Sequence, residues 1–227
     1  MMPSMRIGTW NIAGRWSEHH QALLAKADCD VWLLTEVNER TVLPGYAMHL
    51  SEARVAPRRR WAGIASRKLM ASSPDPHPAS AQVRIGSTTY VSSVLPWRSC
   101  GANRPWVGDR HADKTAHAVD DLLLHLRVAD SLVWGGDWNH ALTGKEYAGS
   151  IGGRRAVMAA LDGLGLEATT TDLPHRIDGL FTIDHLAVPS GLRAQASRVE
   201  AAHEGKRLSD HDAYVVDVDA ASSSLLD

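Results

Sequence analysis

Cysteine is scarce in this sequence, which has two, Cys29 and Cys100, among its 227 residues. Disulfide frameworks and structural zinc sites need cysteines, or cysteine and histidine, at characteristic spacings, and neither cysteine belongs to such a pair. The scarcity excludes a small disulfide-stapled domain and a cysteine-based zinc module. We therefore interpret both residues as structural or free thiols.

Long apolar runs are also missing, since no stretch reaches the roughly 20 residues that a membrane-spanning helix requires. Residues 1–4 lead directly into a strand-like run and lack the basic, apolar and cleavage regions of a secretory signal. We therefore expect no membrane insertion and a cytoplasmic location. Nothing in the sequence indicates an obligate protein partner.

A strong net charge is absent as well, because the formal charge is −2. The charge is nevertheless uneven along the chain: residues 54–127 contain twelve Lys and Arg against five Asp and Glu, a balance of +7 that leaves −9 elsewhere. Two interpretations remain open, a localised basic surface or a solvated rim against which acidic segments fold.

The composition is that of an ordinary globular protein, with 44% hydrophobic and 22% charged residues. No composition break or long linker divides the chain, and its length suffices for one large core. We predict a single domain over residues 1–219, followed by a disordered tail over residues 220–227.

Hydrophobic patterning predicts short strands that alternate with helices. The chain opens as a β-α-β unit, with a strand over residues 5–13, a helix over 17–27 that begins after Ser17 as N-cap, and a strand over 31–35. The middle portion has strands without intervening helices, which indicates antiparallel or mixed sheet. Further strands are predicted at 62–66, 82–85, 89–95, 132–134, 183–188, 193–200 and 213–217, and further helices at 112–127 and 154–164.

Acidic, amide and imidazole side chains lie at or near the ends of five short apolar runs. They are Asn11, Glu36, Asp137 with Asn139, Asp184, and Asp210 with His211. Runs of this kind are typical of strands buried on both faces, which places the polar groups at a sheet rim. Burying an unpaired carboxylate costs several kcal/mol, on the order of a domain's net stability. The pattern therefore predicts a convergent polar site centred on a metal ion or a phosphate.

Spacing indicates how some of these side chains cooperate. Asp137 and Asn139 are two residues apart and in extended backbone point to the same side. Asp210 directly precedes His211, so their side chains diverge and another carboxylate must orient the imidazole. Asp184 is the natural candidate. A hard oxygen ligand such as Glu36 suits Mg²⁺ or Mn²⁺ better than zinc.

In this order, six segments resemble the motifs of the endonuclease/exonuclease/phosphatase superfamily, the DNase I-like, magnesium-dependent phosphoesterases. They are Trp10-Asn11, Leu34-Thr35-Glu36, Trp61-Ala62-Gly63-Ile64-Ala65, Gly136-Asp137-Trp138-Asn139, Ile183-Asp184-His185 and Ser209-Asp210-His211. The resemblance extends over nearly the whole chain. It implies an α/β (α+β) fold, a four-layer sandwich of two mixed β-sheets flanked by helices, with the active site at one edge.

The resemblance also implies a metal site. Glu36 would bind Mg²⁺, with Asn11 close to it and Asp210 contributing, and Mn²⁺ could substitute. Many relatives with abasic-site activity carry Asp two residues after the first Asn, where this chain has Ala13. A further metal or water contact is therefore missing.

Catalytic roles follow from the same resemblance. Asp137 would orient or deprotonate the attacking water, and Asn139 would stabilise the phosphoryl oxygens. His211, held by Asp184, would contact the scissile phosphate. Relatives usually present a His or Tyr after the mid-chain strand, whereas residues 94–98 read Val-Leu-Pro-Trp-Arg. Candidates for that missing phosphate contact are Arg98, His111, Lys114 and His117.

Aromatic and basic residues interleave in the segment that follows this strand: Trp97, Arg98, Arg104, Trp106 and Arg110. Such interleaving suits a surface on which bases stack while phosphates pair with arginine. The alternative is that the tryptophans cap the core, because the chain has eight Trp and one Phe. The predicted substrate-binding residues are Trp97, Arg98, Arg104, Trp106, Lys114 and His117.

These observations predict a Mg²⁺-dependent phosphoesterase that hydrolyses phosphodiester bonds, with nucleic acid as the leading substrate. A phosphomonoesterase or phospholipase that acts on a small or lipid-like phosphate ester is the first alternative. A catalytically weak binding module that retains the fold is the second. Substrate choice depends on the loops and cannot be derived from the fold.

Overall fold

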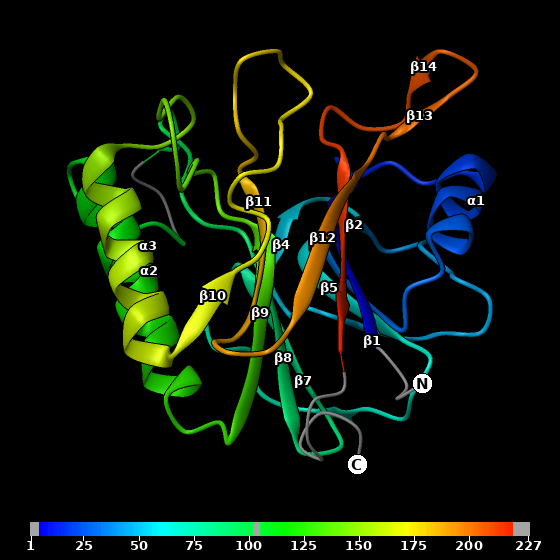
Figure 1. The fold of residues 1–227 in the computed structure, drawn as a ribbon, viewed down its shortest axis with the longest axis horizontal. Helices are drawn as coiled ribbons and strands as arrows, with labels where there is room; N and C mark the ends of the chain where they lie inside the picture. The colour runs from blue at the N-terminus through cyan, green and yellow to red at the C-terminus, as the bar shows by residue number, and fades with distance from the viewer. Residues whose placement is uncertain (1–4, 102–104, 220–227) are drawn as a thin grey trace.

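The computed structural model describes residues 5–101 and 105–219. Two β-sheets pack face to face in it, and helices cover their outer faces (Figure 1). The predicted tail over residues 220–227 lies outside the described residues. Within these ranges, no helix combines the length and the apolar character needed to cross a membrane.

The first sheet is mixed, because β1 and β2 run parallel while the other neighbouring strands run antiparallel. Its strand order is β12-β15-β1-β2-β5-β3, and β4 also pairs with β5. The strands are β1 (Met5–Asn11), β2 (Val31–Asn38), β3 (Ala47–Leu50), β4 (Arg54–Ala56), β5 (Arg59–Ser66), β12 (Ala194–Val199) and β15 (Ala213–Val218).

The second sheet is mixed in the same way, with β8 and β9 parallel and the other pairs antiparallel. Its order is β10-β11-β9-β8-β7-β6. The strands are β6 (Ala71–Ser72), β7 (Ser80–Ile85), β8 (Thr88–Ser93), β9 (Ser131–Asp137), β10 (Leu166–Ala168) and β11 (Asp184–Pro189). A separate two-stranded ribbon consists of β13 (Ala202–His203) and β14 (Lys206–Arg207).

Three helices form the outer layers, α1 (Glu18–Ala27), α2 (His111–Leu126) and α3 (Ile151–Leu164). In Figure 1, α1 covers the first sheet on the right, and α2 and α3 cover the second on the left. Ser17 is the N-cap residue of α1 as predicted, but its hydroxyl bonds to His20 at 2.8 Å instead of capping the backbone. Ser150 caps α3, since its side chain accepts from the Gly153 amide.

Side chains of both sheets interdigitate in the central core. Alternation along each strand sends Ile7 and Leu33 of the first sheet, and Val83, Val133 and Leu186 of the second, into this layer. The remaining apolar side chains pack beneath the helices in two outer cores. The predicted four-layer sandwich of two mixed sheets is therefore confirmed.

Strand direction brings the polar motifs to one rim of the sandwich. The parallel strands β1 and β2 carry Asn11 and Glu36 toward this rim, and β9 ends there at Asp137. Strands β11 and β15 begin at the same rim, directly after the loops that hold Thr182 and His211. It is the upper rim in Figure 1, opposite the labelled termini.

Candidate active site

Asp137 and Asp184 face each other across two neighbouring strands. They are register partners in the antiparallel β9–β11 pair. Asp137 shares the strand face of Val133, and Asp184 shares that of Leu186, both of which lie in the central core. The two carboxylates therefore project between the sheets at the rim, and both are buried.

The approach of β9 to its neighbour depends on Gly136. Its φ is +127°, and a Cβ at this position would lie 2.1 Å from the carbonyl oxygen of Ser93. Only glycine can hold that backbone this close to Ser93. The Asp137 carbonyl in turn accepts from the Leu95 amide at 3.0 Å. The position of the Asp137 carboxylate is thus fixed through its own main chain.

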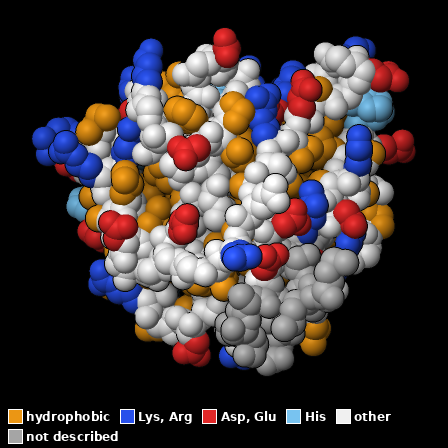
Figure 2. Space-filling model, viewed as in Figure 1, with side chains coloured by type: hydrophobic (Ala, Val, Ile, Leu, Met, Phe, Trp, Pro, Cys, Tyr) orange, Lys and Arg blue, Asp and Glu red, His pale blue; other side chains and the backbone are white. Residues whose placement is uncertain are grey.

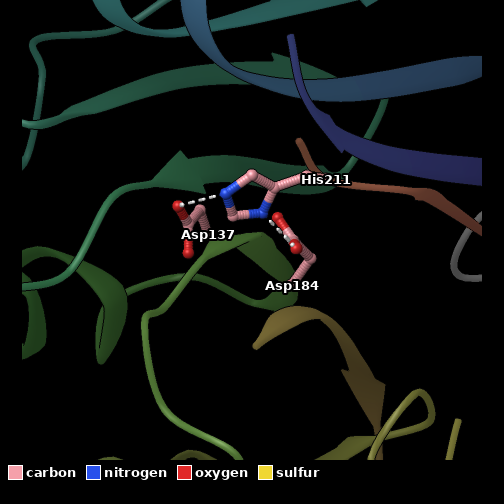
Figure 3. Close-up of side chains that lie close together, drawn as sticks. All are labelled: Asp137, Asp184 and His211. Atoms are coloured by element: carbon pink, nitrogen blue, oxygen red, sulfur yellow. Dashed lines mark hydrogen bonds and ion pairs between the residues drawn. The ribbon is translucent and has the colours of Figure 1, made fainter. Parts of the chain in front are cut away.

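His211 lies between the two carboxylates (Figure 3). Its Nδ1 donates to Oδ2 of Asp184 at 2.7 Å, and its Nε2 lies 3.9 Å from Oδ2 of Asp137. The His211 carbonyl accepts from Nε1 of Trp10 at 3.3 Å and from Arg207 at 3.0 Å. The predicted pairing of His211 with Asp184 is therefore present, and the loop that carries the imidazole is anchored on both sides.

Burial and charge set the protonation of this cluster. Burial lowers the pKa of His211, but the charges of Asp184 and Asp137 outweigh it and raise the pKa to about 10. Burial raises the pKa of Asp137 to about 7, and it raises that of Asp184 as well. At neutral pH the imidazole is therefore protonated, and Asp137 is poised to gain or lose a proton.

Asn11 extends the cluster across the gap between the sheets. Its Nδ2 donates to Oδ2 of Asp137 at 2.9 Å and to Oε1 of Glu36 at 3.3 Å, while its Oδ1 accepts from the Ala13 amide at 2.9 Å. Arg59 completes the arrangement by donating to Oε2 of Glu36 at 2.9 Å. We call the resulting series of contacts the polar chain: Asp184, His211, Asp137, Asn11, Glu36 and Arg59.

Glu36 reaches this chain through an unusual backbone conformation. Strict alternation would turn it to the outer face of the first sheet with Trp32 and Leu34, which lie under α1. Its φ is +51°, a left-handed value that interrupts the alternation. The Glu36 carbonyl accepts from the Gly14 amide at 2.7 Å, which ties this irregularity to the loop after β1.

Asn139 supports Asp137 at the end of β9. Its backbone amide donates to Oδ1 of Asp137 at 3.1 Å, and its Nδ2 donates to the Leu95 carbonyl at 3.0 Å. Its φ is +54°, a conformation that asparagine tolerates better than most residues. The structure thus assigns Asn139 a bracing contact with Asp137, and its expected contact with phosphoryl oxygens stays a prediction.

Asp210 stands at the edge of the rim and is exposed. Ser209 connects it to β1, because the Ser209 hydroxyl donates to the Asn11 carbonyl at 2.6 Å and lies 3.4 Å from Oδ1 of Asp210. Arg176 donates to the Asp210 carbonyl. The structure therefore brings Asp210 close to Asn11 through the main chain, and its carboxylate faces solvent.

Two sets of side chains could hold a metal ion. Asp137, Asp184 and His211 offer ligand atoms within 4.8 Å of one another, the one such acid and imidazole group in the described ranges. Hydrogen bonds already engage some of these atoms, because His211 bonds to Asp184 and Asn11 bonds to Asp137. Glu36 is more open, since its side chain is 27% exposed, and its carboxylate suits a hard cation such as Mg²⁺ or Mn²⁺.

Two predicted substrate-binding residues are buried, which corrects the expectation that they contact substrate. Trp106 is 3% exposed and packs in the core beneath α2. Lys114, also buried, donates from Nζ to the carbonyls of Cys100 and Gly101 at 3.0 and 3.1 Å. Both side chains are therefore enclosed within the protein, at 3% and 7% exposure, and offer almost no surface to a ligand.

The other predicted substrate-binding residues differ in what they can offer. Arg98 is exposed and donates to the carbonyls of Gly149 and Glu146, so part of its guanidinium is used within the protein. His117 is exposed, with Nδ1 bonded to the Val107 carbonyl at 2.8 Å. Trp97 is half-buried beside Trp61 and keeps part of its ring at the surface. Arg104 lies outside the described residues.

Arg59 is the site residue whose placement the sequence did not reveal. In the sequence it is one of three consecutive arginines, residues 58–60, whereas the structure links it directly to Glu36. The usable signal was the strand at 62–66, whose antiparallel pairing with the strand at 31–35 brings its first residues beside Glu36. The left-handed conformations of Glu36 and Arg58 have no comparable signature in the sequence.

Neither a protein-family model nor a curated protein sequence matches this chain. Solved structures do. An AP endonuclease from Archaeoglobus fulgidus is similar with a TM-score of 0.69 at 18% identity, over 93% of this chain and 98% of that one. The 3'-5' exonuclease NExo from Neisseria meningitidis is similar with a TM-score of 0.65 at 18% identity, over 95% of this chain and 100% of the other.

A third similar structure is described as an endonuclease/exonuclease/phosphatase family protein from Leptotrichia buccalis. Its TM-score is 0.66 at 13% identity, over 95% of this chain and 99% of that chain. At such identities the similarity establishes the architecture, including the two mixed sheets and the helices outside them. The chain thus has the DNase I-like fold of the endonuclease/exonuclease/phosphatase proteins.

Proposed function

We propose that this protein is a divalent-metal-dependent phosphoesterase that hydrolyses phosphodiester bonds in nucleic acid. One observation carries the proposal, namely that the imidazole of His211 is held between the buried carboxylates of Asp184 and Asp137. Asn11 links this group through its Nδ2 to the carboxylate of Glu36, which supplies further oxygen atoms. Metal-dependent hydrolysis of a phosphate ester requires a positioned acid and base next to hard oxygen ligands, and these side chains supply such groups.

Glu36 is the proposed metal ligand, and Asn11 and Asp210 are the proposed contributors to the same site. Its partly exposed carboxylate and the amide of Asn11 fit Mg²⁺ or Mn²⁺ in donor chemistry. When bound, such an ion polarises the phosphoryl group and stabilises the charge on the leaving oxygen.

Asp137 is the proposed general base for the attacking water. A pKa near 7 suits that task, because the group can take a proton at neutral pH and release it again. Asn11 and Asn139 hold its two oxygens in place. His211, protonated and oriented by Asp184, would donate from Nε2 to a phosphoryl oxygen.

Nucleic acid is the preferred substrate class because similar folds act on it. The Archaeoglobus protein is described as an AP endonuclease, and the Neisseria protein as a 3'-5' exonuclease and as a 3' phosphatase bound to a DNA hairpin. A small phosphate ester is the second candidate. It is favoured by the internal use of Arg98 and Lys114, and by the mixture of basic and acidic side chains on the face seen in Figure 2.

A metal-dependent turnover screen tests the proposal. The protein is freed of metal and assayed with and without Mg²⁺ or Mn²⁺ on plasmid DNA, abasic duplex, RNA and simple phosphate esters. We expect turnover of a nucleic acid that requires metal, that chelation abolishes and that Asp184→Asn suppresses. Asp217→Asn is the matched control, because Asp217 pairs with Arg6 at the other end of β15.

Each result of the screen has a defined meaning. Turnover of simple phosphate esters but of no nucleic acid would change the proposed substrate class and leave the proposed hydrolysis chemistry unchanged. Full activity after exhaustive metal removal would overturn metal dependence. No turnover of any phosphate ester would overturn the proposed function and favour a binding module.

A further inference from the structure

We propose that Arg59 is a phosphate-binding residue of this site and that it shares the carboxylate of Glu36 with the metal. The inference rests on the proposed phosphoesterase function and names a residue that contacts the substrate. Its starting point is the 2.9 Å hydrogen bond from Nη1 of Arg59 to Oε2 of Glu36. This bond places a permanent positive charge beside the proposed metal ligand.

The loop after β1 is shaped to receive the Arg59 side chain. Gly14 has a φ of +69°, and a Cβ at this position would lie 2.4 Å from Cδ of Arg59. The arginine stem therefore lies across Gly14 in space that only glycine leaves open. Two contacts fix this glycine, since its amide donates to the Glu36 carbonyl and its carbonyl accepts from Asn38 at 2.9 Å.

Arg59 has hydrogen-bond donors to spare. Within the described part of the chain, Glu36 is the hydrogen-bond partner of its guanidinium, which carries five N–H groups. Its side chain is 34% exposed. Arg60, the next residue, is by contrast bonded to the carbonyls of Ser51 and Glu52 and paired with Glu39.

The negative charge of the carboxylates at the rim calls for a cation such as Arg59 if a phosphate is to bind there. Glu36, Asp137, Asp184 and Asp210 surround the place where an anionic phosphate would bind, and their repulsion must be offset. A guanidinium beside Glu36 can donate to phosphoryl oxygens in the two-pronged geometry that arginine and phosphate favour. Among the described residues, Arg59 is the cation bonded to the proposed metal ligand, whereas Arg98 and Lys114 are bonded to main-chain carbonyls.

The shared carboxylate couples the two ligands. A cation that binds Oε2 of Glu36 must displace the guanidinium, which is then free to turn toward phosphate. Metal and phosphate should therefore bind with positive cooperativity, and each should raise the affinity of the other by the same factor. Removing Arg59 should weaken phosphate binding and at the same time favour the metal.

Two titrations test the inference directly, without turnover. Mn²⁺ binding to the metal-free protein is followed by electron paramagnetic resonance, and inorganic phosphate binding with Mg²⁺ present is followed by calorimetry. For Arg59→Ala we expect phosphate affinity lower by about 10- to 100-fold, the loss of a charge-assisted hydrogen bond, and Mn²⁺ affinity several-fold higher. Arg59→Lys keeps the stem over Gly14 and a point charge, so its values should be intermediate.

Arg58→Ala is the matched control, because it removes the same charge from the adjacent, exposed position. Its two affinities should equal those of the wild type. Unchanged phosphate affinity in both Arg59 variants would overturn the inference, as would parallel losses of phosphate and Mn²⁺ affinity, which would indicate a structural role. If the opposite shifts occur in a protein that hydrolyses no phosphate ester, Arg59 stands as a phosphate-binding residue and the proposed hydrolysis fails.

Discussion

The two ends of the polar chain differ in their access to solvent. At one end, the side chains of Asp184, Asp137 and His211 are 1%, 4% and 13% exposed. At the other end, those of Glu36 and Arg59 are 27% and 34% exposed. The closed end has fixed geometry and shifted pKa values, which suits proton transfer, whereas the open end can exchange ions and ligands without rearranging the core.

Asn11 joins these two ends through one amide nitrogen. Its Nδ2 donates to Asp137 on the closed side and to Glu36 on the open side. A neutral amide can bridge two carboxylates that would otherwise repel each other at the gap between the sheets. The connection between the closed end and the open end therefore depends on Asn11, which itself carries no charge.

The largest effect is expected at the closed end. His211→Ala and Asp137→Asn each remove a group that transfers or positions a proton, so turnover should fall by roughly 10² to 10⁴-fold. Steady-state kinetics on the substrate found by the screen measures this, with His203→Ala, an exposed imidazole of β13, as control. Near wild-type turnover in both variants would show that the closed end is not the catalytic one.

We also expect the stability of the folded protein to depend on pH, because buried imidazoles such as that of His185 lie next to the closed end. Burial lowers the pKa of His185 to about 4, below its usual 6.5, and its Nε2 donates to the His140 carbonyl at 2.8 Å. The neutral form is favoured on folding, so its contribution is complete above pH 6.5 and is lost as the pH falls toward 4. Over that range it amounts to about 3 kcal/mol.

Denaturant unfolding of wild type and His185→Gln at several pH values isolates this contribution. The difference in free energy of unfolding between the two proteins should shrink by about 2 to 3 kcal/mol between pH 7 and pH 4.5. Comparison with the variant cancels the opposite contribution of Asp137, whose raised pKa favours folding in acid. A difference that stays constant with pH would mean that His185 is accessible to protons in the folded state.

At the open end, Glu36→Gln should act on metal demand more than on maximal rate. The substitution keeps the shape of the side chain and removes the ligand charge, so half-maximal activity should need at least about 10-fold more Mg²⁺. The variant should unfold at the wild-type temperature, because Glu36 is not part of the core. If the maximal rate of the variant falls while the Mg²⁺ concentration for half-maximal activity is unchanged, metal binding is not a property of the open end.

The smallest effect concerns salt. Arg98→Ala should flatten the salt dependence of nucleic-acid binding less than Arg59→Ala, because part of the Arg98 guanidinium is bonded to the Gly149 and Glu146 carbonyls. Arg59→Ala should flatten the slope of log affinity against log salt by about 0.9, one phosphate contact on duplex DNA. Fluorescence anisotropy at several salt concentrations measures both slopes. A slope that Arg98→Ala flattens more than Arg59→Ala does would reverse this assignment.

The architecture could be predicted because its signals are local and repeated. Apolar runs such as 31–35 and 213–217 mark strands buried on both faces, and the ordered motifs imply the two-sheet sandwich. The short strands β3, β4, β6 and β10 were not predicted, since two to four residues are too few to display a period. The tertiary pairing of their neighbours determines them.

The site was predictable where neighbours in sequence constrain it. Asp210 cannot orient His211, and the expected partner Asp184 makes that contact at 2.7 Å. The prediction that Trp106 and Lys114 contact substrate was wrong, and Trp106 instead follows the alternative in which the tryptophans cap the core. The packing of α2 over the second sheet buries both side chains. Burial of this kind depends on tertiary contacts, so no pattern in the neighbouring sequence indicates it.

The left-handed conformation of Glu36 sets backbone stability against the proposed function at this residue. A non-glycine residue at a φ of +51° costs on the order of 1 kcal/mol, which glycine would recover. A library screened for heat resistance alone should therefore enrich Glu36→Gly, at the expense of the carboxylate. Ala13 and Asn139, with φ values of +53° and +54°, border the same rim. Thermostability engineering of this fold should accordingly hold these backbone positions constant and seek its gains on the far rim.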